Sequence, residues 1–353
     1  MSVTEPAPGA GSLTAAVQAG LQGAGLASLS AGVQRLMDAY RSGEVPAAPL
    51  LASARDAAAY AAYRMPATAA AAGAAFRQMR RGLPGWTPST VLDFGAGTGG
   101  ASWAVADQLS AATGLTLLEQ SGDAIRLGRT ILAQSASAAL RGASWCQWRL
   151  SDEGKTPAPL QPAGLAVAAY LLGELSERQQ EQLVDLAAQT APAVLLLEPG
   201  TPAGHRRILA ARARLLAGGY SVVAPCPHQL ACPLEVPGDW CHFAARLQRS
   251  ATHRRVKGAE LSYEDEKFSY VAAARADVGV PDRPVGRVVR RPQLRKNLVV
   301  LDLCTDSGRA ASLPVGKSKR EAYRRARKAS WGDRWDAGGA PRDAGGRPER
   351  DEG

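Results

Sequence analysis

Aromatic residues, cysteines and long apolar runs are all scarce in this chain of 353 residues. Aromatic side chains make up 5% of the sequence, and there are only 5 cysteines and 4 histidines. The alanine-rich residues 57–76 are interrupted by Arg64 and Pro66 and followed by Arg77, so they do not read as a membrane span. The N-terminal region lacks a basic segment followed by an apolar one, which excludes a secretory signal.

The N-terminal region is also a poor mitochondrial presequence, because it contains Glu5 and has no arginine before Arg35. We therefore expect a cytoplasmic location, with no membrane partner. In a reducing compartment, cysteines serve as metal ligands, core residues or nucleophiles more often than as disulfides.

Positive charge is abundant. Lysine and arginine number 42 against 32 acidic residues, which gives a net charge of +10. Such a balance favours a polyanionic partner, above all RNA, and we expect no DNA partner. The hydrophobic fraction of 46% allows a sizeable core.

Strand-like and helix-like segments alternate in the middle of the chain. The predicted strands are residues 90–94, 115–119, 144–150, 165–171 and 194–198. The predicted helices are residues 100–113, 122–140, 176–190 and 203–217. Strict alternation indicates an α/β fold with a parallel sheet covered on both faces.

The glycine-rich loop refines this fold class. Asp93, Gly95, Gly97 and Gly99 follow the first predicted strand and precede a helix, where glycines permit a tight turn and a close approach to a ligand. Glu119 ends the next strand, where an acidic side chain can hold ribose hydroxyls. The pattern predicts a class I S-adenosylmethionine methyltransferase-like (Rossmann-like) sheet that binds S-adenosylmethionine, with Asp152 as a weak candidate for the adenine contact.

No catalytic signature accompanies the loop. Residues 170–175 lack the Asn/Asp-Pro-Pro-aromatic pattern of N-methylation, and no Pro-Cys nucleophile follows the fourth strand. Glu174 is a conceivable base, but a surface cap is its expected role. The catalytic residues stay unknown, and so does enzymatic activity.

Cysteines cluster after residue 218. Cys226, Cys232 and Cys241 fall within sixteen residues, and Cys304 follows a later strand; prolines after two of them are typical of iron–sulfur loops. Four thiolates also suit zinc, and His228 or His242 could replace one of them. Cys146, on the third strand, is expected to be a buried free cysteine outside the site.

Topology offers a way to bring these cysteines together. If the helix at 203–217 returns the chain to the amino edge of the sheet, Cys226 begins there. If residues 267–273 and 297–303 form the last two core strands, antiparallel to each other, the final strand returns to the same edge and brings Cys304 to the other three. The metal would then hold the cysteine-rich insertion in place, at the opposite edge of the sheet from the glycine loop.

Basic residues occur in three runs. The first run supplies the predicted RNA contacts Arg246, Arg249, Arg254, Arg255 and Lys257. The second contains Arg283, Arg287, Arg290, Arg291, Arg295 and Lys296, and the third contains Arg320, Arg324, Arg325, Arg327 and Lys328.

The domain organisation follows from these features. We predict a flexible tail (1–11), a helical N-terminal module (12–85), a methyltransferase-like core (86–218), a cysteine-rich metal-binding insertion with the final core strands (219–313), and a basic, largely disordered tail (314–353) that includes a helix near 318–329.

Several segments together resemble the methyltransferase-like family associated with the small ribosomal subunit. They are residues 63–68, 197–202, 226–228, 232–233, 240–243 and 263–270. The resemblance spans roughly residues 52–304. The chain departs from the family's mitochondrial members by lacking a presequence, which implies a bacterial cytoplasmic homologue. The resemblance implies that Cys226, Cys232, Cys241 and Cys304 hold a [4Fe–4S] cluster rather than zinc, and that the chain binds small-subunit rRNA during assembly.

Methyl transfer does not follow from this resemblance, because the family includes assembly factors. The alternatives are an active rRNA methyltransferase, or a zinc-stabilised methyltransferase acting on a protein or a small molecule. The basic runs argue against the last of these.

Overall fold

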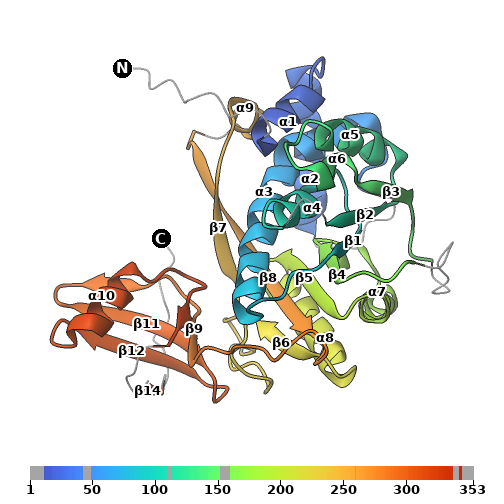
Figure 1. Cartoon of the computed structure of the whole chain (residues 1–353). Coiled ribbons are helices and arrows are strands. Elements are labelled where there is room, and N and C mark those ends of the chain that lie inside the picture. Colours follow the sequence, from blue (N-terminus) through green and yellow to red (C-terminus); the bar gives the residue numbers. More distant parts are fainter. Residues whose placement is uncertain are drawn as a thin grey trace.

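The computed structural model describes residues 12–42, 49–109, 113–151, 160–258, 260–336 and 342–343. Within these residues the chain forms an eight-stranded sheet covered by helices and a second, six-stranded sheet beside it (Figure 1). None of the helices in this part of the chain is long and apolar enough to cross a membrane.

The large sheet has the strand order β3-β2-β1-β4-β5-β8-β6, and β7 pairs with β8. Strands β1 to β5 are parallel, whereas β8 runs antiparallel between β5 and β6. This is the order of a class I methyltransferase-like sheet, and the predicted mixed α/β fold is confirmed. The bounds are β1 Thr90–Phe94, β2 Gly114–Glu119, β3 Ser144–Gln147, β4 Leu165–Ala169, β5 Ala193–Pro199, β6 Ser221–Ala224, β7 Phe243–Gln248 and β8 Tyr263–Ala274.

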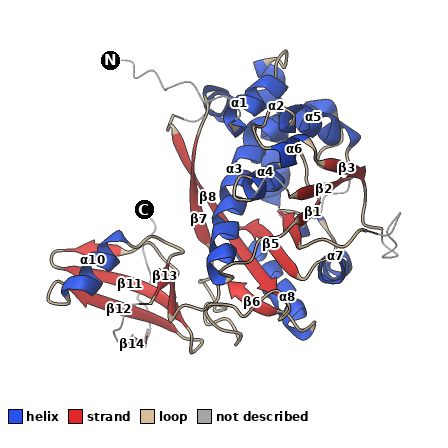
Figure 2. Cartoon of the chain, viewed as in Figure 1, coloured by secondary structure: helices blue, strands red, loops and turns tan. Residues whose placement is uncertain are grey.

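Helices cover both faces of this sheet (Figure 2). Because successive strand residues point to opposite faces, Val91 of β1 joins the core beneath α3 while Leu92 joins the core beneath α7 and α8. The helices are α1 Leu13–Gly20, α2 Leu26–Ser42, α3 Ala54–Gly82, α4 Gly100–Ala106, α5 Gly122–Leu132, α6 Ala138–Arg141, α7 Glu177–Thr190, α8 Pro202–Ala217 and α9 Ala251–Lys257, with a 3₁₀ turn η1 at Leu172–Glu174.

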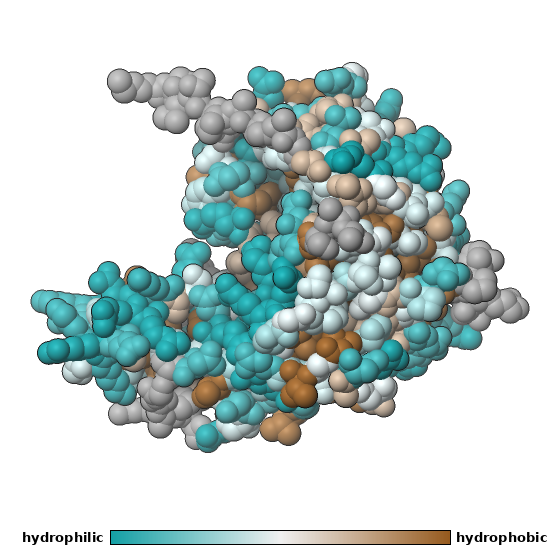
Figure 3. Space-filling model, in the orientation of Figure 1, coloured by the Kyte–Doolittle hydropathy of each residue, from teal (hydrophilic) through white to brown (hydrophobic). Residues whose placement is uncertain are grey.

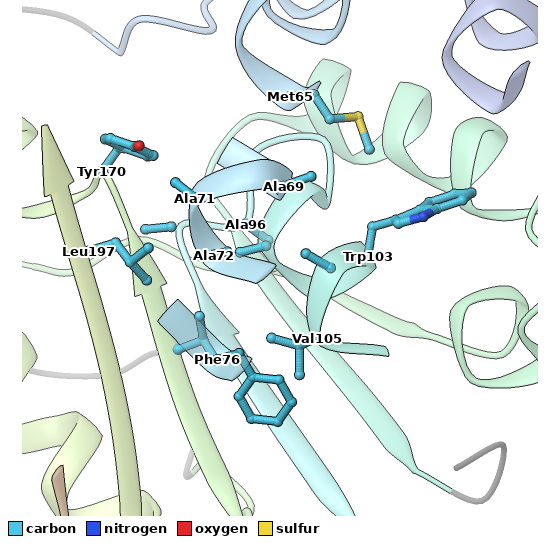
Figure 4. Close-up of a cluster of buried hydrophobic side chains, with 14 of the residues drawn as sticks. Met65, Ala69, Ala71, Ala72, Phe76, Ala96, Trp103, Val105, Tyr170 and Leu197 are labelled. Carbon is cyan, nitrogen blue, oxygen red and sulfur yellow. The ribbon is translucent and has the colours of Figure 1, made fainter. Parts of the chain in front are cut away.

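The long helix α3 is the centre of the predicted helical N-terminal module, whose helices are present. Its buried face is built from small residues, such as Ala71, Ala72 and Ala75, each with 0% exposure. Small side chains let the helix approach the sheet and α4 closely, and Phe76 fills the space beside them (Figure 4). The module therefore shares one core with the sheet. The predicted tail 1–11 lies outside the described residues.

Residues 220–261, predicted to be irregular, contain three elements. The short apolar strand β6 follows α8, and β7 and α9 come later. Because β6 runs parallel to β5, it carries the chain back to the carboxyl edge of the sheet. The prediction that Cys226 begins at the amino edge is therefore wrong.

The second sheet corrects the predicted role of residues 297–303. These residues form β11, which pairs with β9, β10 and β12, so its hydrogen-bonding edges are filled outside the large sheet. Residues 314–336, predicted to lie in a disordered tail, complete this sheet and its helix α10, which lies against it (Figure 1). The bounds are β9 Gly286–Val288, β10 Gln293–Arg295, β11 Leu298–Thr305, β12 Ala310–Gly316, α10 Arg320–Lys328, β13 Arg334–Trp335 and β14 Arg342–Asp343.

Candidate functional site

The glycine loop joins β1 to α4 as predicted. Gly95, Gly97 and Gly99 have φ values of 65°, 57° and 90°, in the left-handed region that favours glycine. A Cβ atom on Gly97 would lie 3.1 Å from the Tyr60 ring, which α3 places over the loop. Both the backbone conformation and this close approach explain the glycines.

Glu119, at the end of β2, holds the loop in place. Its carboxylate accepts hydrogen bonds from the backbone amides of Gly97 and Ser121, both at 2.8 Å. Burial raises the pKa of this carboxyl, and the amide hydrogen bonds oppose the rise. Glu119 also lines the adjacent cavity.

Asp93 has a different role from the predicted ligand contact. It is 1% exposed and does not line the cavity. Its Oδ2 atom accepts hydrogen bonds from the Ser102 amide at 3.1 Å and the Ser102 hydroxyl at 2.7 Å. Burial raises its pKa to about 7. Asp93 therefore anchors the first turn of α4 from behind the loop.

The cavity beside the loop has a volume of about 190 Å³. Gly95, Gly97 and Glu119 line it, whereas Gly99 does not, and Asp152 lies outside the described residues. Sequence reasoning did not place the other lining side chains in this cavity, because no motif marks the helix and the connecting segments that carry them. They include Tyr60, Trp148, Arg149, Leu150, Tyr170, Leu171 and Glu174.

Two acidic side chains, Glu119 and Glu174, line this cavity. Burial, together with the negative charges of Glu119 and Glu198, raises the pKa of Glu174 to about 8. Glu174 is thus a partly buried cavity residue, and the predicted surface cap is wrong. Glu198 is fully buried and pairs with Arg207 at 2.6 Å.

Tyr170 closes the cavity where β4 ends. It has a φ of 61°, which is unusual for a residue with a Cβ atom. Its hydroxyl donates to Glu266 at 2.9 Å, Glu266 pairs with Arg64 at 3.1 Å, and the Arg64 guanidinium lies 4.4 Å from the Tyr170 ring centroid. These contacts tie α3, β4 and β8 together at this edge.

All four predicted metal ligands line one second cavity, of about 30 Å³. Cys226, Cys232 and Cys241 lie in the loop segments after β6, and Cys304 reaches the cavity from β11 of the second sheet. The cavity therefore lies where the two sheets meet, and it shares no lining residue with the glycine-loop cavity. Cys304 meets the other cysteines as predicted, but through a different strand arrangement.

The thiols influence one another. Burial raises the pKa of Cys241, and the neighbouring Cys226, Cys232 and Cys304 raise it further. Burial also raises the pKa of Cys226, against a hydrogen bond and positive charge from Arg212. Across the described residues, however, no group of three or more His, Cys, Asp or Glu side chains is arranged to hold a metal ion.

The remaining metal candidates lie outside this lining. The Nε2 atom of His228 is 3.2 Å from the Cys304 sulfur, so His228 is a neighbour of the thiols. His242 instead stacks on Trp240 and contacts Trp331 edge-on. Cys146 lies on β3, outside the lining of this cavity, and is exposed, so the prediction that it is buried is wrong.

The first basic run is largely engaged in ion pairs. Arg246 pairs with Asp265 at 2.7 Å, and Arg249 and Lys257 both pair with Glu264. Among the other predicted RNA contacts, Arg255 is exposed and Arg254 is half-buried. In the second run, Arg287 is buried.

The third run is exposed. Arg320, Arg324, Arg325, Arg327 and Lys328 of α10 face solvent, and within the described part of the chain no carboxylate forms an ion pair with them. The opposite face of the helix packs Ala322, Tyr323 and Ala326 onto the second sheet. Figure 3 shows hydrophilic residues covering the lobe that carries α10.

Two known mitochondrial proteins are similar in sequence to this chain. The human protein "Ribosome assembly protein METTL17, mitochondrial" is 31% identical over 304 residues, covering 78% of this chain and 61% of the human protein. "Rsm22-cox11 tandem protein 2, mitochondrial" of Schizosaccharomyces pombe is 27% identical over 213 residues, covering 48% of this chain and 28% of the yeast protein. The chain spans less than two thirds of either relative.

Solved structures are similar to this chain at a lower sequence identity. A putative RNA methyltransferase from Pyrococcus horikoshii has a TM-score of 0.38 and 13% identity, covering 60% of this chain and 84% of that one. The glycopeptide N-methyltransferase MtfA complexed with S-adenosylmethionine has a TM-score of 0.36 and 14% identity, covering 57% of this chain and 94% of that one.

A family match covers most of the chain. Residues 54–336 match the family described as "Mitochondrial small ribosomal subunit Rsm22", and this range contains the glycine loop, all four cavity cysteines and α10. The chain therefore belongs to the Rsm22 family.

Proposed function

We propose that this chain binds the small ribosomal subunit and its rRNA during subunit assembly. The observation that carries the proposal is the family match over residues 54–336. The human relative, named as a ribosome assembly protein, supports the same role.

The exposed face of α10 supports an rRNA contact. Its arginines are free of described carboxylates, so their charge is available to phosphate oxygens. Arg246, Arg249 and Lys257 remain candidate contacts, but their ion pairs would have to open first. We therefore place the main contact at α10.

The glycine-loop cavity fits S-adenosylmethionine. Gly95 and Gly97 allow a ligand to approach the backbone, and Glu119 lines the same cavity, where a carboxylate at the end of the second strand can accept hydrogen bonds from ribose hydroxyls. S-adenosylmethionine supplies an electrophilic methyl group when bound. No acceptor-holding motif follows β4, so we propose binding without turnover, with rRNA methylation as the alternative.

The four-cysteine cavity fits a metal centre by its donor set. Its lining includes four thiols and no carboxylate, a set that selects soft metals and iron–sulfur clusters. Tetrahedral zinc needs sulfur atoms about 3.8 Å apart, from Zn–S bonds of about 2.3 Å. A [4Fe–4S] cluster bonds each thiolate to a different iron, so its four thiolates lie farther apart than those around a single zinc ion.

We propose that Cys226, Cys232, Cys241 and Cys304 hold a [4Fe–4S] cluster, with zinc as the alternative. The centre would join the second sheet to the large one, because Cys304 lies on β11 and the others follow β6.

Crosslinking in cells tests the ribosomal role. The full chain is crosslinked to RNA by ultraviolet light, and the crosslinks are mapped. We expect crosslinks on small-subunit rRNA that decrease when Arg320, Arg324 and Arg327 are changed to Gln. Crosslinks spread evenly over unrelated RNAs would contradict the proposal. Transfer of a labelled methyl group to precursor particles separates binding from rRNA methylation.

A further inference from the structure

Arg287 is a buried cation next to the four thiols. It is 2% exposed and lines the cysteine cavity from β9. Its guanidinium donates to the carbonyl oxygen of Pro225 at 2.8 Å, to the side-chain oxygen of Gln78 at 2.7 Å and to the carbonyl oxygen of Gly332 at 3.0 Å. All three acceptors are neutral.

Arg212 is a second buried cation on the same cavity. It is 6% exposed and comes from α8. Its Nη2 atom donates to the carbonyl oxygens of Leu230 at 2.8 Å and His228 at 3.3 Å, and its Nε atom has no hydrogen-bond partner. These acceptors are neutral as well.

Neither guanidinium forms an ion pair with a carboxylate of the described residues, and the cavity lining contains no Asp or Glu. Burying a charge without a counter-ion is strongly unfavourable. Arginine cannot avoid this cost by losing its proton, whereas a lysine or histidine could. The cavity thus contains two positive charges that require a negative partner.

We propose that Arg212 and Arg287 are the counter-ions of an anionic metal–thiolate centre in this cavity. The inference rests on the proposed metal centre, and it further specifies that this centre is negatively charged. A metal core of about +2 bound by four thiolates has a net charge of about −2, for a [4Fe–4S] cluster and for zinc alike. Two guanidinium groups balance this charge. In a cavity without metal, four neutral thiols would leave both guanidinium charges uncompensated.

The strand register supports a shared role. Arg287 of β9 lies directly opposite Cys304 of β11, so the second sheet delivers one cation and one thiol together. Arg287 also bonds Pro225, next to Cys226, and Gln78 of α3. The same guanidinium therefore links the second sheet, the cysteine loop and the long helix. On this proposal, the stability of these links depends on the charge in the cavity.

The test compares Arg212→Met and Arg287→Met with two controls. Arg214→Met removes an arginine of the same helix that pairs at the surface with Asp185, and Arg287→Lys keeps the positive charge. Iron, zinc and sulfide are measured in the full chain purified without oxygen, and Tm is measured before and after metal removal by a chelator with reductant.

We expect both methionine variants to retain less than half of the wild-type metal, Arg287→Lys to retain more than Arg287→Met, and Arg214→Met to equal the wild type. The metal-loaded methionine variants should have a lower Tm than the wild type. After metal removal their Tm should equal or exceed the wild-type value, because an uncompensated buried charge has been removed. A purely structural role would lower Tm in both states.

Two different outcomes would overturn the inference. If the wild type contains no metal, the proposed centre is wrong and its counter-ions with it. If the wild type contains metal and both methionine variants retain it fully, or lose the same Tm with and without metal, the centre stands and only the counter-ion role fails. Should a methionine variant not fold, Arg287→Lys and the wild-type metal content still decide between these outcomes.

Discussion

Asp93 is a buried carboxyl whose protonation is coupled to folding. Burial raises its folded-state pKa to about 7, above the 3.8 of an unperturbed aspartate. A raised carboxyl pKa means that the folded state binds a proton that the unfolded state has lost. The contribution of Asp93 to stability is therefore greatest below pH 4 and declines as the pH rises from 4 to 7.

Asp93→Asn removes this dependence, because an amide oxygen can still accept from Ser102. We expect the free energy of unfolding of the wild type, relative to Asp93→Asn, to fall by about 1 kcal/mol per pH unit between pH 5 and 6.5. Denaturant unfolding of both proteins across this range measures it. A difference that is independent of pH would contradict the role of Asp93 as a protonated anchor.

Glu119 gives a second prediction, for ligand binding. Both carboxylate oxygens accept loop amides, so Glu119→Gln keeps only one of these acceptors. We expect the affinity for S-adenosylmethionine to fall about tenfold, equal to about 1.4 kcal/mol. Calorimetry measures it, with Glu177→Gln, an exposed residue of α7, as the control. Equal affinities for all three proteins would show that Glu119 does not support the ligand.

Short-range spacing was sufficient to predict Gly95, Gly97 and Glu119 in the cavity, because they belong to one strand–loop–helix unit. It could not place Trp148 or Glu174, which reach the cavity only through the pairing of β3 and β4 with β1 and β2. The prediction for Arg287 was wrong about exposure, because the side chain is buried. Its charge suggested a surface run, whereas neutral carbonyls and the cysteine cavity surround it.

At the scale of elements, α3 depends on small residues. Ala72 is fully buried between the helix and the sheet (Figure 4), whereas Ala74 of the same helix lines an open groove. We expect Ala72→Leu to lower the free energy of unfolding by about 1–3 kcal/mol through overpacking, and Ala74→Leu to change it by less than about 0.5 kcal/mol. Urea unfolding of both variants checks this, and equal stability would show that α3 is loosely packed.

Helix α10 gives an electrostatic prediction. Each phosphate contact contributes about 0.7–0.9 to the slope of log K against log salt concentration. Changing Arg320, Arg324 and Arg327 to Gln should therefore reduce the slope for rRNA binding by about 2–3. Arg246→Gln, which removes a paired charge, should change it by much less. A larger effect of Arg246→Gln would show that the first basic run, and not α10, makes the main contact with rRNA.

The pairing partners of strands limited what could be predicted at this scale. Residues 297–303 were recognised as a strand, but local periodicity does not reveal which sheet a strand joins. The four-residue β6 was missed because a short apolar run before a Cys- and Pro-rich loop lacks a detectable period. Missing β6 misplaced Cys226 at the amino edge.

At the scale of the whole molecule, the two sheets meet at the cysteine cavity. One thiol and one guanidinium come from the second sheet, and three thiols and one guanidinium come from the large sheet's side. A metal centre with balanced charge would make these two parts fold as one unit. Sequence order alone could not reveal this junction, because Cys304 is more than sixty residues from Cys241.

Metal and sulfide analysis of the wild type and two cysteine variants tests this account most directly. The full chain is purified without oxygen, and iron, zinc, acid-labile sulfide and absorbance near 400 nm are measured. The account predicts about four irons and about four sulfides per wild-type chain, their loss in Cys304→Ala, and their retention in Cys146→Ala, whose thiol lies outside the cavity. A wild-type chain that is free of metal, or a Cys304→Ala variant that retains the wild-type content, would contradict it.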